Sequence, residues 1–426
     1  MKSFILLLAV FCVFVDNAFC QVKNYNNWML RDGAIVNFAG EIGTVSYKDD
    51  VEDIHSCISD DDGNLKFYID SHNIYDMDGN VIYTLSSLPY YTVAVKDPLL
   101  QNSYYFLMIN WRKSLRVIHI MDNGNNDYSV NSYYVDNDLY GPYFGVYIYN
   151  DNIYTVSYRH KSVDLIWHCI KSDNAIALNT IEIPNKLSYD PFSTSFHINN
   201  DLTKLYINGF DQMYIVDLDV VGNIFGNVSV LPWGFDAFEF SECGDYIYIV
   251  ERVEEGGKIM RCHEEDFMNP ERYEILMKDF DTPGNYTSDI KLAVDGNLYF
   301  LKGDNTSLSV ITDTDGDCNI LLNEIPLTND NVHRYLPQMP RFQSSFRLTE
   351  ECYNVKTDYV GYPYSSISWD FGDGYVVDGV DNPTHTYSIP GKYKVSMTVF
   401  FKDGSSRTIS KSIETEGRSK PTIKFR

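Results

Sequence analysis

The chain has 426 residues, of which 15% are aromatic, including 34 tyrosines, and its formal net charge is −25. This length suits two or more domains with sizeable cores. The acidic excess argues against binding to nucleic acid or to anionic lipid surfaces, because both require basic patches. Short alternating runs of aromatic and β-branched residues recur and long helical periodicities are scarce, so we expect an all-β protein.

The N-terminus has the pattern of a cleaved secretory signal over residues 1–20. A charged start precedes the apolar run 4–15, and small residues occupy the −3 and −1 positions before Gln21. This run is too short to cross about 30 Å of hydrocarbon as a helix, which argues against a membrane anchor. We therefore expect a secreted mature chain that is not inserted in a membrane and that ends in a polar tail, 417–426.

Residues 21–342 repeat one loose pattern, in which a turn rich in Asp, Asn or Gly precedes a strand with a tyrosine. Successive copies lie roughly 45 residues apart, the spacing of four-stranded propeller blades. We expect a β-propeller of about seven blades, with an array of two-sheet sandwiches as the alternative. We also expect the stretch 24–38 to close the ring by pairing with strands of the segment 298–337. The repeated tyrosines are Tyr68, Tyr105, Tyr154, Tyr206, Tyr248 and Tyr299.

Eight cysteines are present, and two of them fall within the expected signal. An exported chain can oxidise the remaining six, and no Cys or His spacing typical of a zinc site occurs. We expect one disulfide between Cys243 and Cys262, within a pair of neighbouring strands. We expect a second between Cys318 and Cys352, linking the two domains. Free thiols packed as small apolar groups are the alternative.

Three turns share the pattern Asp-x-Asp-Gly followed by Asn or Asp, at 60–64, 76–80 and 313–317. Alternate carboxylates around a glycine can surround Ca²⁺, which prefers oxygen ligands. The same pattern also forms ordinary tight turns between antiparallel strands. No other cofactor is expected. The candidate Ca²⁺ ligands are Asp313, Asp315 and Asp317.

Three triplets have the form Asn-x-Ser/Thr, and their asparagines are Asn227, Asn285 and Asn305. They are acceptors for N-glycosylation if the secreting cell is eukaryotic. A chain this rich in Asn, Ser and Thr contains a few such triplets by chance, so they do not identify the source.

Residues 343–416 form a second unit in which strand and turn signals alternate. Trp369 and Phe371 share one face of a short strand, which ends at the turn Asp373-Gly374. The WDFGDG, NPTHTY and PGKYKVSMTV blocks resemble the PKD (polycystic kidney disease) domain in order and spacing. The resemblance implies an immunoglobulin-like β-sandwich of the kind found in extracellular proteins. Its expected core residues are Trp369, Phe371, Tyr387 and Tyr393.

The long domain also resembles part of a known class of proteins. The motifs at 27–28, 57–68, 238–241 and 336–338 follow one another as in large secreted propeller–PKD proteins of Bacteroidetes. Together with the PKD blocks, this resemblance covers nearly the whole mature chain. It implies a propeller followed by a PKD sandwich and names no reaction.

The sequence holds no GxSxG, HExxH, phosphate-binding or dinucleotide-binding signature. We therefore expect a secreted, non-enzymatic recognition or adhesion protein that binds an extracellular protein or glycan. The alternative is a carbohydrate-active propeller enzyme with the PKD unit as a spacer. Two convergent carboxylates about 5 to 10 Å apart in the central funnel would favour the enzyme, whereas a flat aromatic rim would favour the binder.

Overall fold

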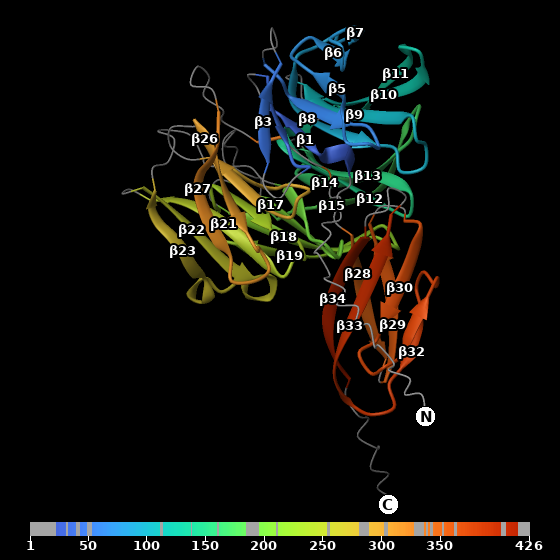
Figure 1. The fold of residues 1–426 in the computed structure, drawn as a ribbon, viewed down its shortest axis with the longest axis vertical. Coiled ribbons are helices and arrows are strands. Elements are labelled where there is room, and N and C mark those ends of the chain that lie inside the picture. The colour runs from blue at the N-terminus through green and yellow to red at the C-terminus, as the bar shows by residue number, and fades with distance from the viewer. Residues whose placement is uncertain are drawn as a thin grey trace, which may run out of the picture.

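The strands form a propeller of consecutive sheets followed by a smaller two-sheet sandwich (Figure 1). The structure is a computed structural model. It describes residues 23–30, 33–39, 43–48, 53–110, 114–137, 139–159, 162–184, 196–209, 212–253, 256–280, 289–301, 306–327, 336–337, 340, 344–351, 353–361, 364–401 and 406–415.

Seven antiparallel sheets are described in the propeller, one with three strands and six with four, each made of consecutive strands. Three short 3-10 helices accompany them: η1 (Lys23–Tyr25), η2 (Glu264–Asp266) and η3 (Pro270–Arg272). The first four sheets contain β1 (Asn27–Met29), β2 (Ala34–Asn37) and β3 (Thr44–Tyr47); β4 (Ser56–Ser59), β5 (Leu65–Ile69), β6 (Asn73–Asp76) and β7 (Val81–Thr84); β8 (Pro89–Lys96), β9 (Ser103–Asn110), β10 (Leu115–Gly124) and β11 (Asp127–Asp136); and β12 (Leu139–Tyr149), β13 (Asn152–Arg159), β14 (Asp164–Ile170) and β15 (Ala175–Glu182). The other three contain β16 (Phe196–Ile198), β17 (Lys204–Asn208), β18 (Met213–Asp219) and β19 (Ile224–Leu231); β20 (Ala237–Phe240), β21 (Tyr246–Val253), β22 (Gly256–His263) and β23 (Glu274–Phe280); and β24 (Ile290–Leu292), β25 (Leu298–Leu301), β26 (Ser307–Thr312) and β27 (Asn319–Pro326).

The first strands of successive sheets lie side by side, which is the arrangement of propeller blades around an axis. β1 lies next to β4, β4 next to β8, β8 next to β12, β12 next to β16, and β20 next to β24. The all-β prediction and the propeller prediction are confirmed. The number of complete blades stays a prediction, because parts of the chain between residues 328 and 343 lie outside the described residues.

The burial of each strand follows its position in its sheet. β9 lies between β8 and β10 in its sheet, and all eight of its residues are buried. β11 is an outer strand, and its exposed and half-buried residues alternate. Interior strands therefore read as continuous apolar runs, whereas outer strands show the period-two pattern of a half-buried strand.

The tyrosine repeat found in the sequence marks one structural position. Tyr68, Tyr154 and Tyr206 lie in the second strand of their respective sheets. Tyr105, Tyr248 and Tyr299 lie in the second strand of three further sheets. The spacing of these tyrosines is therefore the spacing of the sheets.

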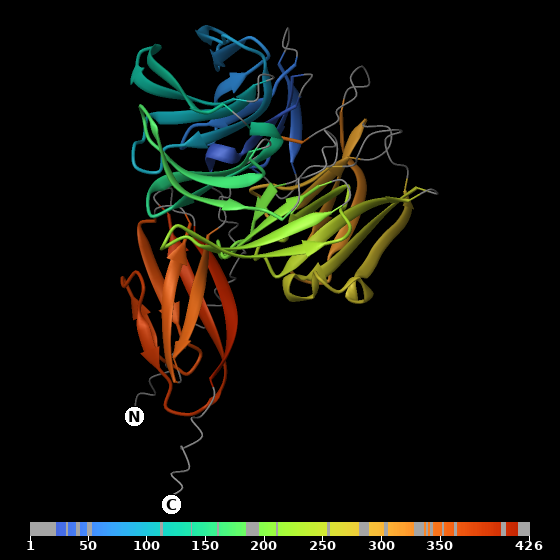
Figure 2. The same cartoon turned by 180° about the vertical axis from the view of Figure 1, so that it is seen from behind.

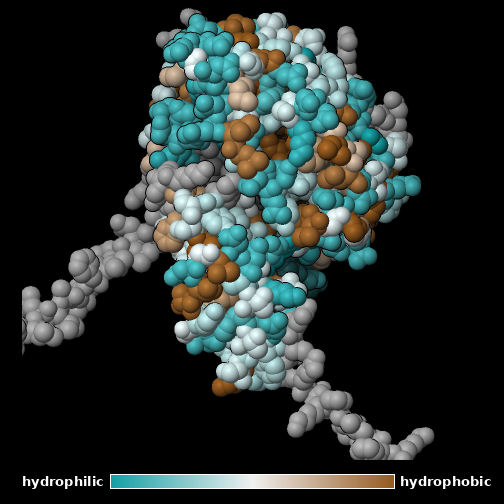
Figure 3. Space-filling view, turned by 90° about the vertical axis from the view of Figure 1, so that its right-hand side faces the viewer, coloured by the Kyte–Doolittle hydropathy of each residue, from teal (hydrophilic) through white to brown (hydrophobic). Residues whose placement is uncertain are grey.

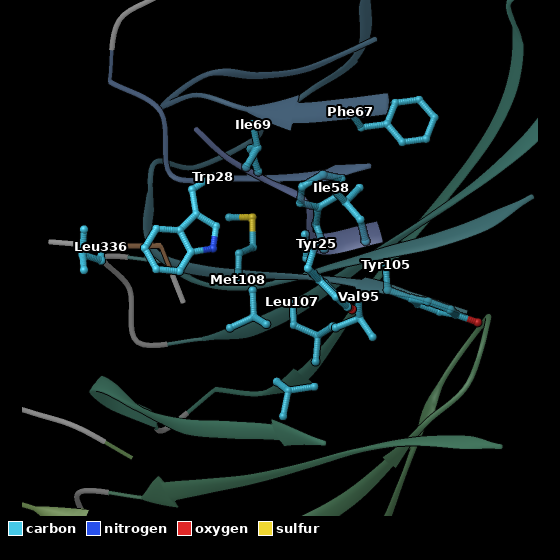
Figure 4. Close-up of a cluster of buried hydrophobic side chains, with 14 of the residues drawn as sticks. Tyr25, Trp28, Ile58, Phe67, Ile69, Val95, Tyr105, Leu107, Met108 and Leu336 are labelled. Carbon is cyan, nitrogen blue, oxygen red and sulfur yellow. The ribbon is translucent and has the colours of Figure 1, made fainter. Parts of the chain in front are cut away.

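The first and last sheets of the propeller meet through aromatic side chains. The Trp28 ring lies 4.7 Å from the Phe38 ring and 5.8 Å from the Tyr299 ring, measured between centroids, and the Tyr299 hydroxyl accepts a hydrogen bond from the Gly43 N–H at 2.9 Å. Trp28 belongs to a large apolar cluster that also contains Leu336 (Figure 4). Among the described strands, 24–38 does not pair with the last sheet as predicted, because β1, β2 and β3 form a sheet of their own. Contact between sheet faces joins the two sheets instead.

The sandwich follows the propeller and consists of two sheets. One has the order β28-β29-β32 and the other the order β31-β30-β33-β34. In both views it lies below the propeller, against the green sheets that hold β12 to β19 (Figures 1 and 2). The strands are β28 (Ser345–Glu351), β29 (Asn354–Val360), β30 (Ser366–Asp370), β31 (Val376–Asp378), β32 (Thr384–Thr386), β33 (Gly391–Phe400) and β34 (Ser406–Thr415).

Candidate functional site

Of the four predicted core residues of the sandwich, Trp369, Phe371 and Tyr387 are buried, whereas Tyr393 is half-buried and packs against them. Trp369 and Phe371 are fully buried, and the Trp369 Nε1 donates to the Val380 carbonyl at 3.0 Å. Tyr387 is also buried, its hydroxyl donates to the Phe371 carbonyl at 2.8 Å, and its ring stacks on Tyr393 at 3.8 Å between centroids. These residues pack between the two sheets, so the candidate binding residues of the sandwich are sought among its exposed side chains.

One edge of the sandwich exposes large apolar side chains. Tyr375, Val376 and Val380 are 47%, 54% and 42% exposed, and they lie on or beside β31, an edge strand of its sheet. We call these three residues the recognition edge. The opposite edge strand of the same sheet, β34, contacts the propeller through Arg407 and Lys411. The sandwich is thus held at one edge and presents the other.

Tyr375 is backed by a rigid pair of side chains. Its ring is stacked on His385, with 4.7 Å between centroids and 12° between planes, and His385 Nε2 lies 2.8 Å from Asp373 Oδ2. Partial burial raises the pKa of Asp373, but hydrogen bonds from His385 and from the Tyr375 N–H outweigh it and hold that pKa below its usual range. Asp373 therefore stays ionised, and it orients the His385 ring on which Tyr375 stacks.

Sequence reasoning missed Tyr375 as a surface residue. It follows the Asp373-Gly374 turn, where the alternation that identifies buried positions is interrupted. An aromatic side chain directly after a turn glycine was the available signal. Figure 3 shows apolar patches on one face of the molecule, both on the propeller and on the smaller lobe below it.

The predicted Ca²⁺ ligands do not converge. Asp313 Oδ2 accepts the Asp317 N–H of its own turn at 3.2 Å, whereas Asp315 Oδ2 accepts the Cys243 N–H of the neighbouring sheet at 2.8 Å. Among the residues that the structure describes, no group of three His, Cys, Asp or Glu side chains could hold a metal ion. Backbone N–H groups bind one oxygen each of Asp313 and Asp315, so this arrangement adds no support for Ca²⁺ at Asp313, Asp315 and Asp317, and the site stays a prediction.

The turn 313–317 instead fastens two sheets of the propeller together. The Thr314 carbonyl accepts the Tyr248 hydroxyl at 2.7 Å, and the Gly316 carbonyl accepts Arg261 Nη1 at 2.6 Å. With the Asp315 contact and the bond from the Glu242 N–H to Thr314 Oγ1 at 3.3 Å, four hydrogen bonds join the β26–β27 turn to the sheet of β20 to β23.

The two related turns are also structural. Asp60 Oδ1 accepts the N–H groups of Asp62 and Asn64 at 3.0 and 2.9 Å. Asp76 Oδ1 accepts those of Asp78 and Asn80 at 3.0 and 2.8 Å. The first aspartate of each turn thus closes a hairpin, as the alternative interpretation of the pattern expects.

The cysteines differ from their prediction. Cys243 and Cys262 are free thiols, so the disulfide expected between them is wrong. Cys243 lies in the β20–β21 turn. Cys262 lies in β22, where it is the partner of Ile247 in β21, and its side chain packs into the core. Burial raises the pKa of both thiols to about 12, which keeps them protonated and poorly nucleophilic. Cys318 is also free, and its expected partner Cys352 lies outside the described residues.

Of the predicted glycosylation sites, Asn227 is exposed in the outer strand β19, and Asn285 and Asn305 lie outside the described residues. The expected signal 1–20 and the tail 417–426 lie outside them as well. Within the described part of the chain, no helix has the length and apolar character needed to span a bilayer.

One serine, one histidine and one aspartate come together in the propeller. Ser103 Oγ lies 2.7 Å from His119 Nε2 and donates to Asp97 Oδ2 at 3.0 Å. A nucleophilic triad needs histidine between serine and aspartate, but here serine lies in the middle and is fully buried. Burial also lowers the pKa of His119. The arrangement ties the β8–β9 turn to β10, and the hydroxyl is not positioned for nucleophilic attack.

Comparison with known proteins identifies the sandwich. Residues 355–416 match the PKD domain family. The chain is 26% identical to the PKD1 domain of Vibrio anguillarum Epp over 18% of this chain and 93% of that one, with a TM-score of 0.17. It is 28% identical to the PKD1 domain of the Vibrio cholerae metalloprotease PrtV over 17% and 94%, again with a TM-score of 0.17.

The whole chain has more distant similarities. It is 10% identical to the β-propeller domain of Myceliophteria thermophila Cps50 (Swd1) over 70% of this chain and 96% of that one, with a TM-score of 0.41. A search of curated proteins found no match. The propeller assignment rests on the sheet topology described above, and the resemblance to proteins of Bacteroidetes stays a prediction. The chain is an all-β protein in which a propeller is followed by a PKD domain.

Proposed function

We propose that this chain is a secreted, non-enzymatic recognition protein that binds an extracellular protein or glycan through the recognition edge of its PKD domain. The exposure of Tyr375, Val376 and Val380, on the edge opposite the strand that contacts the propeller, is the observation that supports this most. PKD domains are typical of extracellular proteins, which agrees with the secretory pattern of residues 1–20. Tyr375 is already stacked on His385, so its side chain loses little conformational freedom on binding.

The surroundings of the recognition edge suit a partner with polar groups around an apolar centre. Asp373, Asp378 and Asp381 are exposed beside it and offer carboxylate oxygens. Such oxygens accept hydrogen bonds from sugar hydroxyl groups or from basic side chains of a protein. The Tyr375 ring supplies the flat apolar contact between them.

The test is a binding array of glycans and extracellular proteins probed with the purified mature chain and with Tyr375→Ala. Because exposed aromatic residues often dominate binding energy, we expect the variant to lose roughly 10-fold or more in affinity. The matched control is Tyr134→Ala, which removes a 52% exposed tyrosine from β11 of the propeller. Equal binding by Tyr375→Ala and the wild type would contradict the proposal, and cleavage of a bound glycan would favour the enzyme.

A further inference from the structure

In the described part of the chain, three basic side chains of the PKD domain contact the propeller. Arg407 Nη2 donates to the Glu242 carbonyl at 2.8 Å and lies 3.7 Å from Glu242 Oε1. Lys411 Nζ donates to Asp201 Oδ1, which also accepts the Ser345 hydroxyl at 2.9 Å. Both basic residues come from β34, so one strand carries two ion pairs to the propeller.

A third basic residue extends this contact. Arg347 in β28 donates through Nη2 to the Tyr149 hydroxyl at 3.3 Å, and its guanidinium carbon lies 5.7 Å from the centre of the Tyr149 ring. The arginine also pairs with Asp358 of its own domain. We call Arg347, Arg407 and Lys411, together with Asp201 and Glu242, the ionic joint.

The propeller residues that the PKD domain contacts here occupy equivalent places in three successive sheets. Asp201 lies in the β16–β17 turn and Glu242 in the β20–β21 turn, and Tyr149, which Arg347 contacts, is the last residue of β12. Each lies at the end of the first strand of its sheet or directly after it, so these places face one side of the propeller. Asp245 lies in the same β20–β21 turn, and its pKa is raised by burial and by the nearby carboxylate of Asp315. The propeller thus offers an acidic surface to a basic face of the PKD domain.

Apolar contact across the joint is limited. Among the described residues of the PKD domain, Val360 and Phe401 belong to apolar clusters of the propeller, and the others of its core form a cluster of their own. The pairs differ in their contact with water: the Lys411 and Asp201 side chains are 20% and 32% exposed, whereas those of Arg407 and Glu242 are 8% and 24% exposed. Dissolved ions can therefore screen the Lys411–Asp201 pair most strongly.

We propose that the acidic turns of the propeller are a docking surface for the PKD domain and that charge holds the two together reversibly. Screening the ionic joint releases the PKD domain from the propeller while both domains stay folded. Docking also fixes the direction in which the recognition edge points. The inference concerns the joint alone and holds whatever the recognition edge binds.

The test is small-angle X-ray scattering of the mature full-length chain at rising concentrations of NaCl. Between about 0.1 M and about 1 M salt the screening length falls from about 10 Å to about 3 Å, so we expect the radius of gyration to increase. Circular dichroism at each concentration verifies that the domains remain folded. An unchanged scattering profile across the series would overturn the proposal without any variant.

Charge reversal gives a second, independent test at low salt. Lys411→Glu places two carboxylates together at Asp201 and is expected to open the joint, and adding Asp201→Lys is expected to close it again. The control is Lys392→Glu, because Lys392 pairs with Glu414 on the same domain at a place where the two side chains are 77% and 64% exposed. If Lys411→Glu and Lys392→Glu both scatter like the wild type, charge does not hold the joint.

Discussion

At the scale of single residues, the buried aromatic side chains carry the stability of each domain. Trp369 is fully buried, lies edge-on to Phe346 at 5.2 Å between centroids, and donates its indole N–H to the Val380 carbonyl. It therefore combines apolar burial with a satisfied polar group, and both are lost when the side chain is truncated.

Trp369→Ala is expected to destabilise the PKD domain by about 3 to 5 kcal/mol, as for other large buried aromatic residues. A small domain has little more stability than this, so the variant domain should be largely unfolded by near-UV circular dichroism. Tyr375→Ala is the control, because Tyr375 is exposed and its removal leaves no cavity. A fully folded Trp369→Ala domain would mean that the tryptophan is not part of the core.

His168 makes stability depend on pH. It is buried in β14, and burial lowers its pKa from 6.5 to about 4. Because the unfolded chain binds a proton more readily, the contribution of His168 is complete above about pH 6.5 and is lost as the pH falls towards about 4, on the order of 3 kcal/mol in total. Denaturant melts at several pH values should show this loss.

His168→Gln is expected to reduce the slope of the unfolding free energy against pH by the equivalent of about one bound proton. His72→Gln, at an exposed position, should leave this slope unchanged. His119, whose pKa is also lowered by burial, keeps a slope of the same sign in both variants. Identical slopes for His168→Gln and the wild type would show that His168 is not buried in its neutral form.

At the scale of elements, turns join the sheets of the propeller to one another. The turn 313–317 contacts the sheet of β20 to β23 with backbone and side-chain groups. Asp315 is therefore part of the packing between sheets.

Asp315→Ala removes the charged acceptor of the Cys243 N–H and is expected to cost about 1 to 3 kcal/mol, measured by chemical denaturation. The control is Asp317→Ala, a substitution of an exposed residue in the same turn. Ca²⁺ and a chelator should both leave the Tm unchanged. A Tm that rises with Ca²⁺ concentration would instead reveal a bound ion.

At the scale of the whole molecule, the seam between the first and last sheets closes the propeller. Trp28, Phe38 and Tyr299 lie in it, and Trp28 and Phe38 are fully buried. A ring that opens at this seam exposes two sheet faces at once, so its packing affects every sheet.

Trp28→Ala is expected to lower the stability of the entire propeller by about 3 to 5 kcal/mol. Calorimetry should show the propeller transition at a lower temperature with its cooperativity retained. Tyr47→Ala in β3 of the same sheet is the control, because Tyr47 is 42% exposed. Loss of hydrogen-exchange protection confined to β1, β2 and β3 would contradict closure by this seam.

The sequence by itself determined the all-β class, the place of the PKD domain, its core aromatic residues and the spacing of the propeller sheets. These features depend on local patterns, namely alternation along a strand and glycine or aspartate in turns, which neighbouring residues express without reference to the rest of the chain. The roles of Trp369 and of the tyrosine repeat can therefore be predicted from the sequence.

Only the tertiary structure decided what the turns and edges contact. Asp315 contacts Cys243, which is 72 positions away in the sequence, and Lys411 contacts Asp201, which is 210 positions away. No local sequence pattern encodes which two distant segments will face each other. The same holds for the free cysteines, for the seam at Trp28 and for the exposure of Tyr375. Each depends on how whole sheets pack. Whether a side chain joins two sheets, pairs with another residue or stays exposed is decided by neighbours that come from distant strands.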